Sequence, residues 1–127
     1  MDTDYSALEG ITVVFAEDVE FLRISVERLL SRKVKKVVTA KDGAEALEKV
    51  RELQPDMLIT DIEMPEMTGT ELVEAIRNDL KLAMPIIVLT AHDGETHQVP
   101  GADARLYKPV RKTDLFDTMV RLLKEGN

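Results

Sequence analysis

Short apolar runs and segments of helical periodicity alternate along this chain. The five runs are Ile11–Ala16, Val37–Ala40, Met57–Thr60, Ile86–Thr90 and Leu106–Tyr107. The first, third and fourth runs are nearly all apolar, which is typical of parallel strands that helices cover on both faces. Because parallel strands are joined by crossover connections, usually helices, this alternation predicts an α/β fold with a doubly wound, five-stranded parallel sheet.

The segments between and after the runs carry apolar residues at spacings of three and four, the period of an amphipathic helix. Four helices are predicted, on Val19, Leu22, Val26, Leu29 and Leu30; on Leu47, Val50 and Leu53; on Leu72, Val73, Ile76 and Leu80; and on Phe116, Met119, Val120 and Leu123. We expect all these side chains to lie in the core. Thr113 or Asp114 is the expected N-cap of the last helix.

The fourth crossover differs from the others. Residues 91–101 contain few apolar side chains and end in Pro100–Gly101, so they have room for a turn or two of helix at most. His92 and His97 lie there five residues apart, which is not the four-residue spacing of paired metal ligands, and we expect exposed loop residues. We therefore predict a fourth helix that is shortened or missing.

Composition excludes several classes of protein. The 127 residues, 44% of them hydrophobic, suffice for one domain with one core. With 24 acidic and 17 basic residues the net charge is -7, and without a long Lys/Arg run we expect no direct nucleic-acid binding. The lack of cysteine excludes disulfides and thiolate sites. No apolar stretch approaches the ~20 residues of a membrane span and no secretion signal is evident, so we expect a cytoplasmic domain without membrane insertion.

Polar side chains stand where the apolar runs end. Glu17 and Asp18 follow the first run, Asp61 follows the third, Thr90 ends the fourth and Lys108 follows the fifth. In open α/β sheets, sites form beyond the carboxyl ends of the strands, where the strand order reverses. If the order is 2-1-3-4-5, the first and third strands are neighbours. The three carboxylates then lie together, with a hydroxyl and an ammonium group beside them.

This combination of groups suits phosphoryl chemistry. Clustered carboxylates repel one another unless a cation or a proton intervenes, and Mg²⁺ prefers such oxygen ligands. An aspartate such as Asp61 can act as a nucleophile on phosphorus, with a metal, the Lys108 ammonium and the Thr90 hydroxyl as partners of the phosphoryl oxygens. Each residue alone has a structural explanation, since Glu17 or Asp18 could simply cap the next helix. The joint pattern is what indicates a site.

These residues resemble the receiver domains of two-component response regulators. The resemblance spans residues 11–124, with short tails at 1–10 and 125–127 that we expect to be loosely held. The motifs are Val14-Phe15-Ala16-Glu17-Asp18, Thr60-Asp61-Ile62-Glu63-Met64-Pro65 with Gly69, Leu89-Thr90-Ala91, Gly101-Ala102-Asp103 and Lys108-Pro109. The resemblance implies the flavodoxin-like strand order 2-1-3-4-5. It also implies a signalling switch rather than a free-standing enzyme, with phosphotransfer and autodephosphorylation confined to its own aspartate.

The resemblance further assigns roles to individual residues. Asp61 is the expected phosphoacceptor, and its donor is a phosphohistidine on a sensor histidine kinase or a histidine phosphotransfer protein. Asp18 and Asp61 are expected to bind Mg²⁺ directly, Glu17 through water and Glu63 through its backbone carbonyl, with Mn²⁺ able to substitute. Thr90, the Ala91 backbone amide and Lys108 are expected to bind the phosphoryl group. The Lys108–Pro109 bond is expected to be cis, which is inexpensive only before proline.

Two further positions depart from the family pattern. Arg105 stands three residues before the lysine, where many receivers carry a switch aromatic. Tyr107 falls on the same face of the strand and is a candidate substitute, although an ordinary surface arginine is an equally good reading of Arg105. Glu63 places an acid two residues after the phosphoacceptor, and we hypothesise that it alters the lifetime of the phosphoryl group.

Three questions stay open at this point. A receiver-shaped binding module that works without phosphorylation is one alternative, and an aspartate-nucleophile phosphohydrolase that uses Glu63 as acid or base is another. Met64 and Met67 either contact a partner or pack in the core or within the loop. We expect the output to lie in a partner or in a further segment, neither of which the sequence identifies.

Overall fold

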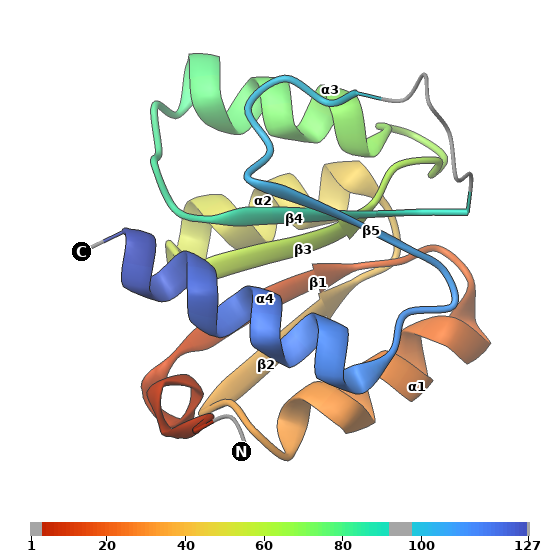
Figure 1. Cartoon of the computed structure of the whole chain (residues 1–127). Helices are drawn as coiled ribbons and strands as arrows, with labels where there is room; N and C mark the ends of the chain where they lie inside the picture. Colours follow the sequence, from red (N-terminus) through yellow and green to blue (C-terminus); the bar gives the residue numbers. More distant parts are fainter. Residues whose placement is uncertain (1–3, 92–97, 127) are drawn as a thin grey trace.

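Five parallel strands form one sheet in the order β2-β1-β3-β4-β5. The computed structural model describes residues 4–91 and 98–126. The strands are β1 (Thr12–Ala16), β2 (Lys36–Ala40), β3 (Met57–Asp61), β4 (Ile86–Thr90) and β5 (Ala104–Tyr107). The predicted fold class and strand order are confirmed, and Figure 1 shows β1 and β3 next to each other within the sheet.

Helices cover both faces of this sheet (Figure 1). They are α1 (Glu20–Ser31), α2 (Gly43–Leu53), α3 (Gly69–Glu74), which continues into a π-helical turn over Ala75–Asp79, and α4 (Lys112–Glu125). Side chains of α1 and α4 share one buried cluster and those of α2 and α3 share the other, because successive strand residues point to opposite faces. Within the described ranges, no helix combines the length and apolar character that crossing a membrane requires.

The last helix starts earlier than predicted. Its N-cap is Arg111, whose side chain makes no capping hydrogen bond, so the prediction of Thr113 or Asp114 is wrong. Both residues lie in the first turn of α4 instead. There the Asp114 carboxylate interacts favourably with the positive end of the helix dipole, which explains an acid at this place without a capping role.

The N-terminal segment packs against the domain. Ser6–Gly10 form a 3₁₀ helix whose Leu8 is fully buried, and the Tyr5 hydroxyl donates a 2.7 Å hydrogen bond to Asp117 of α4. The expectation of a loosely held tail is therefore wrong for this segment, because one leucine anchors it in the core. The domain limits of 11–124 stay a prediction.

The start of α1 is more exposed than its periodicity predicts. Val19 is 47% exposed, Leu22 36% and Phe21 75%, so the prediction that the whole apolar stripe lies in the core is wrong for Val19 and Leu22. It is also wrong for Leu53 at the end of α2, which is 39% exposed. Leu30, near the other end of α1, is fully buried. The exposed turn of α1 comes shortly after the end of β1, at the carboxyl end of the sheet, where the candidate site lies.

No helix occupies the described part of the fourth crossover, residues 91 and 98–103, in agreement with the predicted shortening. His92 and His97 lie outside the described residues. The backbone turns at Gly101, whose φ of 94° is in the left-handed region that favours glycine.

Arg77 ties this crossover to the π-helical turn. Its guanidinium group donates to the Gly101 carbonyl at 3.0 Å and the Leu82 carbonyl at 2.7 Å, and pairs with Asp103 at 2.9 Å. The same Asp103 carboxylate accepts a 2.8 Å hydrogen bond from the Ile86 amide at the start of β4. Arg77 therefore fastens Gly101 and Asp103, at the end of this connection, to the π-helical turn.

Candidate functional site

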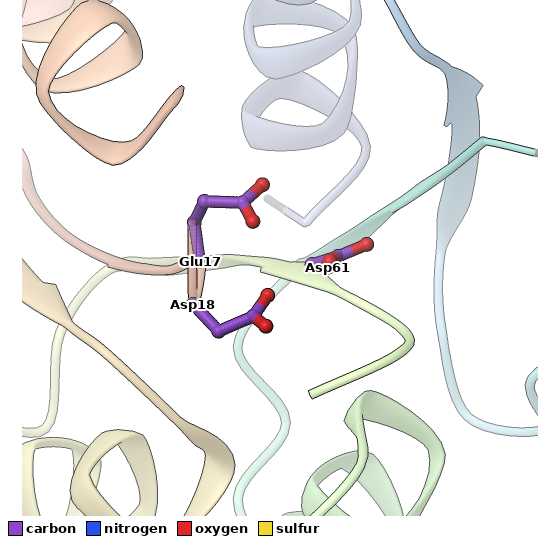
Figure 2. A group of neighbouring side chains, drawn as sticks. All are labelled: Glu17, Asp18 and Asp61. Carbon is purple, nitrogen blue, oxygen red and sulfur yellow. The ribbon is translucent and has the colours of Figure 1, made fainter. Parts of the chain in front are cut away.

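Three carboxylates meet at the carboxyl end of the sheet. Glu17 and Asp18 follow β1 and Asp61 ends β3, and these strands pair directly in register, with Ala16 opposite Thr60. One oxygen from each carboxylate lies within 4.8 Å of the other two. Figure 2 shows Glu17 and Asp18 extending from the end of β1 toward Asp61. The predicted cluster therefore forms.

The other predicted side chains join the same site. A cavity of about 200 Å³ is lined by Asp18, Val19, Asp61, Ile62, Glu63, Thr90, Ala91 and Lys108. Thr90 is buried at the end of β4, the neighbour of β3, whereas Asp18 and Glu63 are exposed at the rim. The structure thus brings together residues that four different strand ends supply.

Lys108 neutralises the buried part of the carboxylate cluster. Its ammonium donates a 2.9 Å hydrogen bond to Glu17 Oε1 and lies 3.1 Å from Asp61 Oδ1. Burial alone would lower the pKa of Lys108, but the hydrogen bond to Glu17 and the charge of Asp61 outweigh it, so the pKa is raised. The lysine therefore stays charged between two acids.

Glu17 uses both of its oxygens inside the protein. Besides Lys108 at Oε1, the Val19 amide donates a 3.1 Å hydrogen bond to Oε2. The side chain is 1% exposed, and its own amide donates to the Ala40 carbonyl of β2 at 3.0 Å. Glu17 is therefore rigidly held, whereas the neighbouring Asp18 carboxylate faces solvent.

The loop after β3 folds back tightly beneath Asp61. The Gly69 amide donates a 2.7 Å hydrogen bond to the Ile62 carbonyl, and a Cβ at Gly69 would collide with the Asp61 carbonyl. A capping box between Thr68 and Glu71 then starts α3. Glycine is required at 69 so that the loop that carries Glu63 can turn back against the Asp61 backbone.

The two methionines of this loop pack inward. Met64 is 7% exposed and belongs to the buried cluster beneath α2 and α3, and Met67 packs against that cluster. Of the interpretations left open, packing in the core or within the loop is the one that the structure supports.

The chain after β5 is fixed to the end of β4. The Lys108–Pro109 bond is cis, as expected, and the Lys108 amide donates a 2.8 Å hydrogen bond to the Thr90 carbonyl. Arg105 and Tyr107 do share one face, because the Arg105 guanidinium lies 5.7 Å from the centre of the Tyr107 ring. Tyr107 is 43% exposed and pairs in register with Thr90, so it stands beside the site.

The donor set fits a hard divalent cation. Its ligands are all oxygens, they come from two adjacent strands, and one of them, Asp18, is solvent-exposed and so leaves room for retained water. Mg²⁺ prefers this combination of carboxylates and water, and Mn²⁺ accepts the same ligands.

Burial raises the pKa of the Asp61 carboxyl; the Lys108 ammonium opposes the rise and the Glu17 charge adds to it. In metal-free protein, the folded state then binds the Asp61 proton more tightly than the unfolded state does. Ionisation of Asp61 therefore costs stability as the pH rises through its folded pKa, and this cost is absent below the unfolded value of ~4.

The Asp61→Asn variant is accordingly expected to be more stable than the native protein at neutral pH in EDTA, with a difference that shrinks as the pH falls toward about 4.5. Urea denaturation across this range measures the difference in unfolding free energy. Asp79→Asn, an exposed change of equal charge, is the control. A difference that stays constant or grows on acidification would contradict the assignment.

One residue near the site has no counterpart in the sequence prediction. Arg23 of α1 donates a 2.9 Å hydrogen bond back to the Glu17 carbonyl. The signal in the sequence was a single cation among the apolar positions of an amphipathic helix, six residues after Glu17. Such a cation commonly extends to solvent, so its spacing alone did not reveal the contact.

Comparison with known proteins identifies relatives over nearly the whole chain. The family model described as response regulator receiver domain matches residues 13–120. Protein PilG of Pseudomonas aeruginosa is 31% identical over 113 residues, which are 85% of this chain and 84% of PilG. The alkaline phosphatase synthesis transcriptional regulatory protein PhoP of Bacillus subtilis is 35% identical over 118 residues, 90% of this chain but 49% of PhoP. Hybrid signal transduction histidine kinase D of Dictyostelium discoideum is 36% identical over 116 residues, and this chain spans 7% of its length.

Solved structures agree with these relatives. Chemotaxis protein CheY4 of Vibrio cholerae superposes with a TM-score of 0.80 at 33% identity, covering 87% of this chain and 97% of that one. A CheY-like response regulator receiver domain protein of Methanospirillum hungatei gives a TM-score of 0.82 at 28% identity, covering 90% of this chain and 94% of that one.

Proposed function

Because this chain belongs to the response regulator receiver domain family, we propose that it is a phosphorylatable switch whose Asp61 accepts a phosphoryl group in a Mg²⁺-dependent reaction. The donor is a phosphohistidine on a sensor histidine kinase or a histidine phosphotransfer protein. The phosphorylated domain then changes conformation and controls a partner or an output domain in the cytoplasm.

One observation carries this proposal. Asp18, Asp61, Thr90, Ala91 and Lys108 line a single cavity of about 200 Å³ at the carboxyl end of the sheet. The cavity thus joins a carboxylate that can attack phosphorus, a second carboxylate that can bind a metal, and hydroxyl, amide and ammonium donors for phosphoryl oxygens. This combination supports modification of Asp61.

The residues of the site are proposed to hold the metal in different ways. Asp18 and Asp61 supply oxygens that face the cavity, and the Glu63 carbonyl is the further protein ligand that we propose. Glu17 has both oxygens engaged by Lys108 and Val19, which supports a role through water rather than by direct contact. Bound Mg²⁺ would offset the charge that develops on the phosphoryl oxygens during transfer.

In the transfer step, an Asp61 oxygen forms a bond to phosphorus while the bond from phosphorus to the donor nitrogen breaks, and the leaving imidazole keeps the electron pair. Lys108, already 3.1 Å from Asp61 Oδ1, can pair with a phosphoryl oxygen. The Thr90 hydroxyl and the Ala91 amide supply donors on the β4 side of the cavity. In autodephosphorylation, water attacks the same phosphorus atom, the bond from phosphorus to the Asp61 oxygen breaks, and inorganic phosphate leaves while the carboxylate is regenerated.

The direct test uses a small phosphodonor such as acetyl phosphate. Protein with Mg²⁺ is expected to gain one phosphoryl group by intact mass, and protein in excess EDTA is expected to gain none. Equal labelling with and without the metal would contradict the metal-dependent step. No labelling in either sample would favour a binding module that works without phosphorylation.

The Glu63 side chain is proposed to tune the lifetime of the phosphoryl group. It lies at the rim of the cavity, two residues after Asp61, where it can engage the metal or the attacking water. We expect Glu63→Ala to change the dephosphorylation rate by about tenfold, less than the ~10²–10⁴-fold of a fully positioned general acid or base, because Glu63 is exposed at the rim. Decay of phosphorylated protein is followed by mass, with Glu74→Ala as an exposed control of equal charge change. An unchanged dephosphorylation rate in Glu63→Ala would contradict this role of the Glu63 side chain.

The exposed apolar side chains of α1 offer a docking surface for the protein donor. The exposed apolar residues are Val19, the N-cap of α1, and Phe21, Leu22 and Ile24 in its first turns. Leu22 also lines a mainly apolar groove of about 380 Å³ between α1 and the chain after β5, and Lys108 belongs to both this groove and the phosphoryl cavity. A donor that covers these side chains with apolar residues of its own would bring its phosphohistidine to Asp61.

Phe21→Ala is therefore expected to slow phosphotransfer from a protein donor about tenfold, the effect of losing one interface aromatic. Labelling from acetyl phosphate should not change, because Phe21 does not line the cavity. Leu53→Ala, which removes an exposed apolar side chain of α2, is the matched control. Equal losses with both kinds of donor would indicate a damaged site rather than a docking surface.

We propose that this domain transmits its phosphorylation signal differently from other receivers at the face of β5 that carries Arg105 and Tyr107. Their side chains stack on each other beside Thr90, and the described residues place no helix over them. We propose that Tyr107 partly replaces the switch aromatic.

A further inference from the structure

Arg23 reaches from α1 back over the metal-binding loop. Its guanidinium donates a 2.9 Å hydrogen bond to the Glu17 carbonyl and makes a longer contact of 3.5 Å with the Asp18 carbonyl. The side chain is 19% exposed, and its only carboxylate neighbour among the described residues is Glu20 at 4.0 Å. Arg23 therefore contacts the backbone of two predicted metal ligands without touching their carboxylates.

The orientation of the Asp18 side chain depends on that backbone more than the orientation of the Glu17 side chain does. Glu17 is buried and held by Lys108 and Val19. The Asp18 carboxylate is exposed, and no residue in the described ranges forms a hydrogen bond or ion pair with it. Its direction is consequently set by the peptide units on either side of it, and the Glu17 carbonyl belongs to one of them.

We propose that Arg23 is a positioning residue for the metal site. Its contacts with the Glu17 and Asp18 carbonyls fix the peptide units on either side of Asp18, and these units orient the Asp18 carboxylate toward the cavity. This inference rests on the proposed function, since it concerns affinity for Mg²⁺. Partners in the outer shell of a metal site typically contribute 10–100-fold to metal affinity by orienting the ligands.

Charge alone predicts the opposite effect. A guanidinium that contacts the backbone of Glu17 and Asp18 repels a cation bound at the neighbouring site, so removing it without any loss of positioning would tighten Mg²⁺ binding. The direction of the change in affinity therefore separates the two roles. A general loss of stability would not by itself produce either result in protein that is still folded.

The experiment measures Mg²⁺ affinity of unphosphorylated protein by calorimetry, after circular dichroism has shown that each variant is folded. Arg23→Gln is expected to bind Mg²⁺ about tenfold more weakly than the native protein. Arg23→Lys, which keeps the charge and one donor, should lose less. Arg28→Gln removes an equal charge from the exposed face of the same helix and should bind as the native protein does.

A double-mutant cycle with Asp18→Ala identifies the route. If Arg23 acts through Asp18, Arg23→Gln causes no further loss of Mg²⁺ affinity once Asp18 is alanine. Unchanged or tighter binding by Arg23→Gln in the native background would overturn the inference and leave the proposed function standing. Absence of Mg²⁺ binding by the native protein would overturn both.

Discussion

The Lys108→Met variant is expected to lose about 2 kcal/mol of unfolding free energy in metal-free solution at neutral pH. Removing one partner of a fully buried ion pair costs ~3–5 kcal/mol, because the other charge is left without compensation. The Lys108 side chain is 20% exposed, so solvent recovers part of that cost. The two carboxylates that lose their cation, Glu17 and Asp61, also repel each other once the lysine is gone.

Urea denaturation in EDTA measures this loss. Lys112→Met is the matched control, because Lys112 is an exposed lysine at the start of α4. Addition of Mg²⁺ should restore more stability to Lys108→Met than to the control variant, since a bound cation replaces the missing charge and stabilises the folded state by mass action. Equal stability of the two variants would show that the contacts of Lys108 with Glu17 and Asp61 do not stabilise the fold.

The Asp18→Ala variant is expected to lose about 100-fold or more in Mg²⁺ affinity, because loss of an outer-shell partner alone costs 10–100-fold. Asp18 is exposed and its carboxylate has no partner among the described residues, so folding should be unaffected. When Mg²⁺ is titrated at a fixed concentration of acetyl phosphate, the Mg²⁺ concentration that gives half-maximal labelling should rise by the same factor as the affinity falls.

Asp79→Ala is the control for the charge change, since Asp79 is exposed in the π-helical turn away from the site. Native-like Mg²⁺ affinity in Asp18→Ala would show that Asp18 does not bind the metal. The cluster around Asp61 would then be held together by Lys108 alone.

The parallel sheet and the site were predictable for one reason. Buried strands such as Ile86–Thr90 must be continuously apolar, and in a parallel sheet their carboxyl ends meet at one edge. The residue after each run, such as Asp61, is therefore placed at that edge by the pattern alone. The family resemblance then supplied the strand order that makes β1 and β3 neighbours.

Other features depend on contacts that no local pattern encodes. Leu8 is a single leucine in a polar N-terminal segment, and its burial follows from the space that α4 and β1 leave. The periodicity of α1 does not reveal that its first turn lies at the carboxyl end of the sheet, so it wrongly predicts that Val19 and Leu22 lie in the core. The hydrogen bonds of Arg23 and Arg77 to backbone carbonyls likewise require the folded loops.

Asp61, the acceptor that we propose, is held in place by its neighbours. Lys108 offsets its charge, the Ile62 amide donates a 2.9 Å hydrogen bond to it, and Glu17 binds the same lysine. Glu63, at the rim of the cavity, is where we propose that the lifetime of the phosphoryl group is set.

The most direct measurement is the intact mass of the native protein and of Asp61→Asn after parallel incubation with acetyl phosphate and Mg²⁺. The amide keeps the size of the side chain but cannot form an acyl phosphate. A gain of one phosphoryl group by the native protein and none by Asp61→Asn is the predicted result. Equal gains by the two proteins would contradict the assignment of Asp61 as the phosphoacceptor.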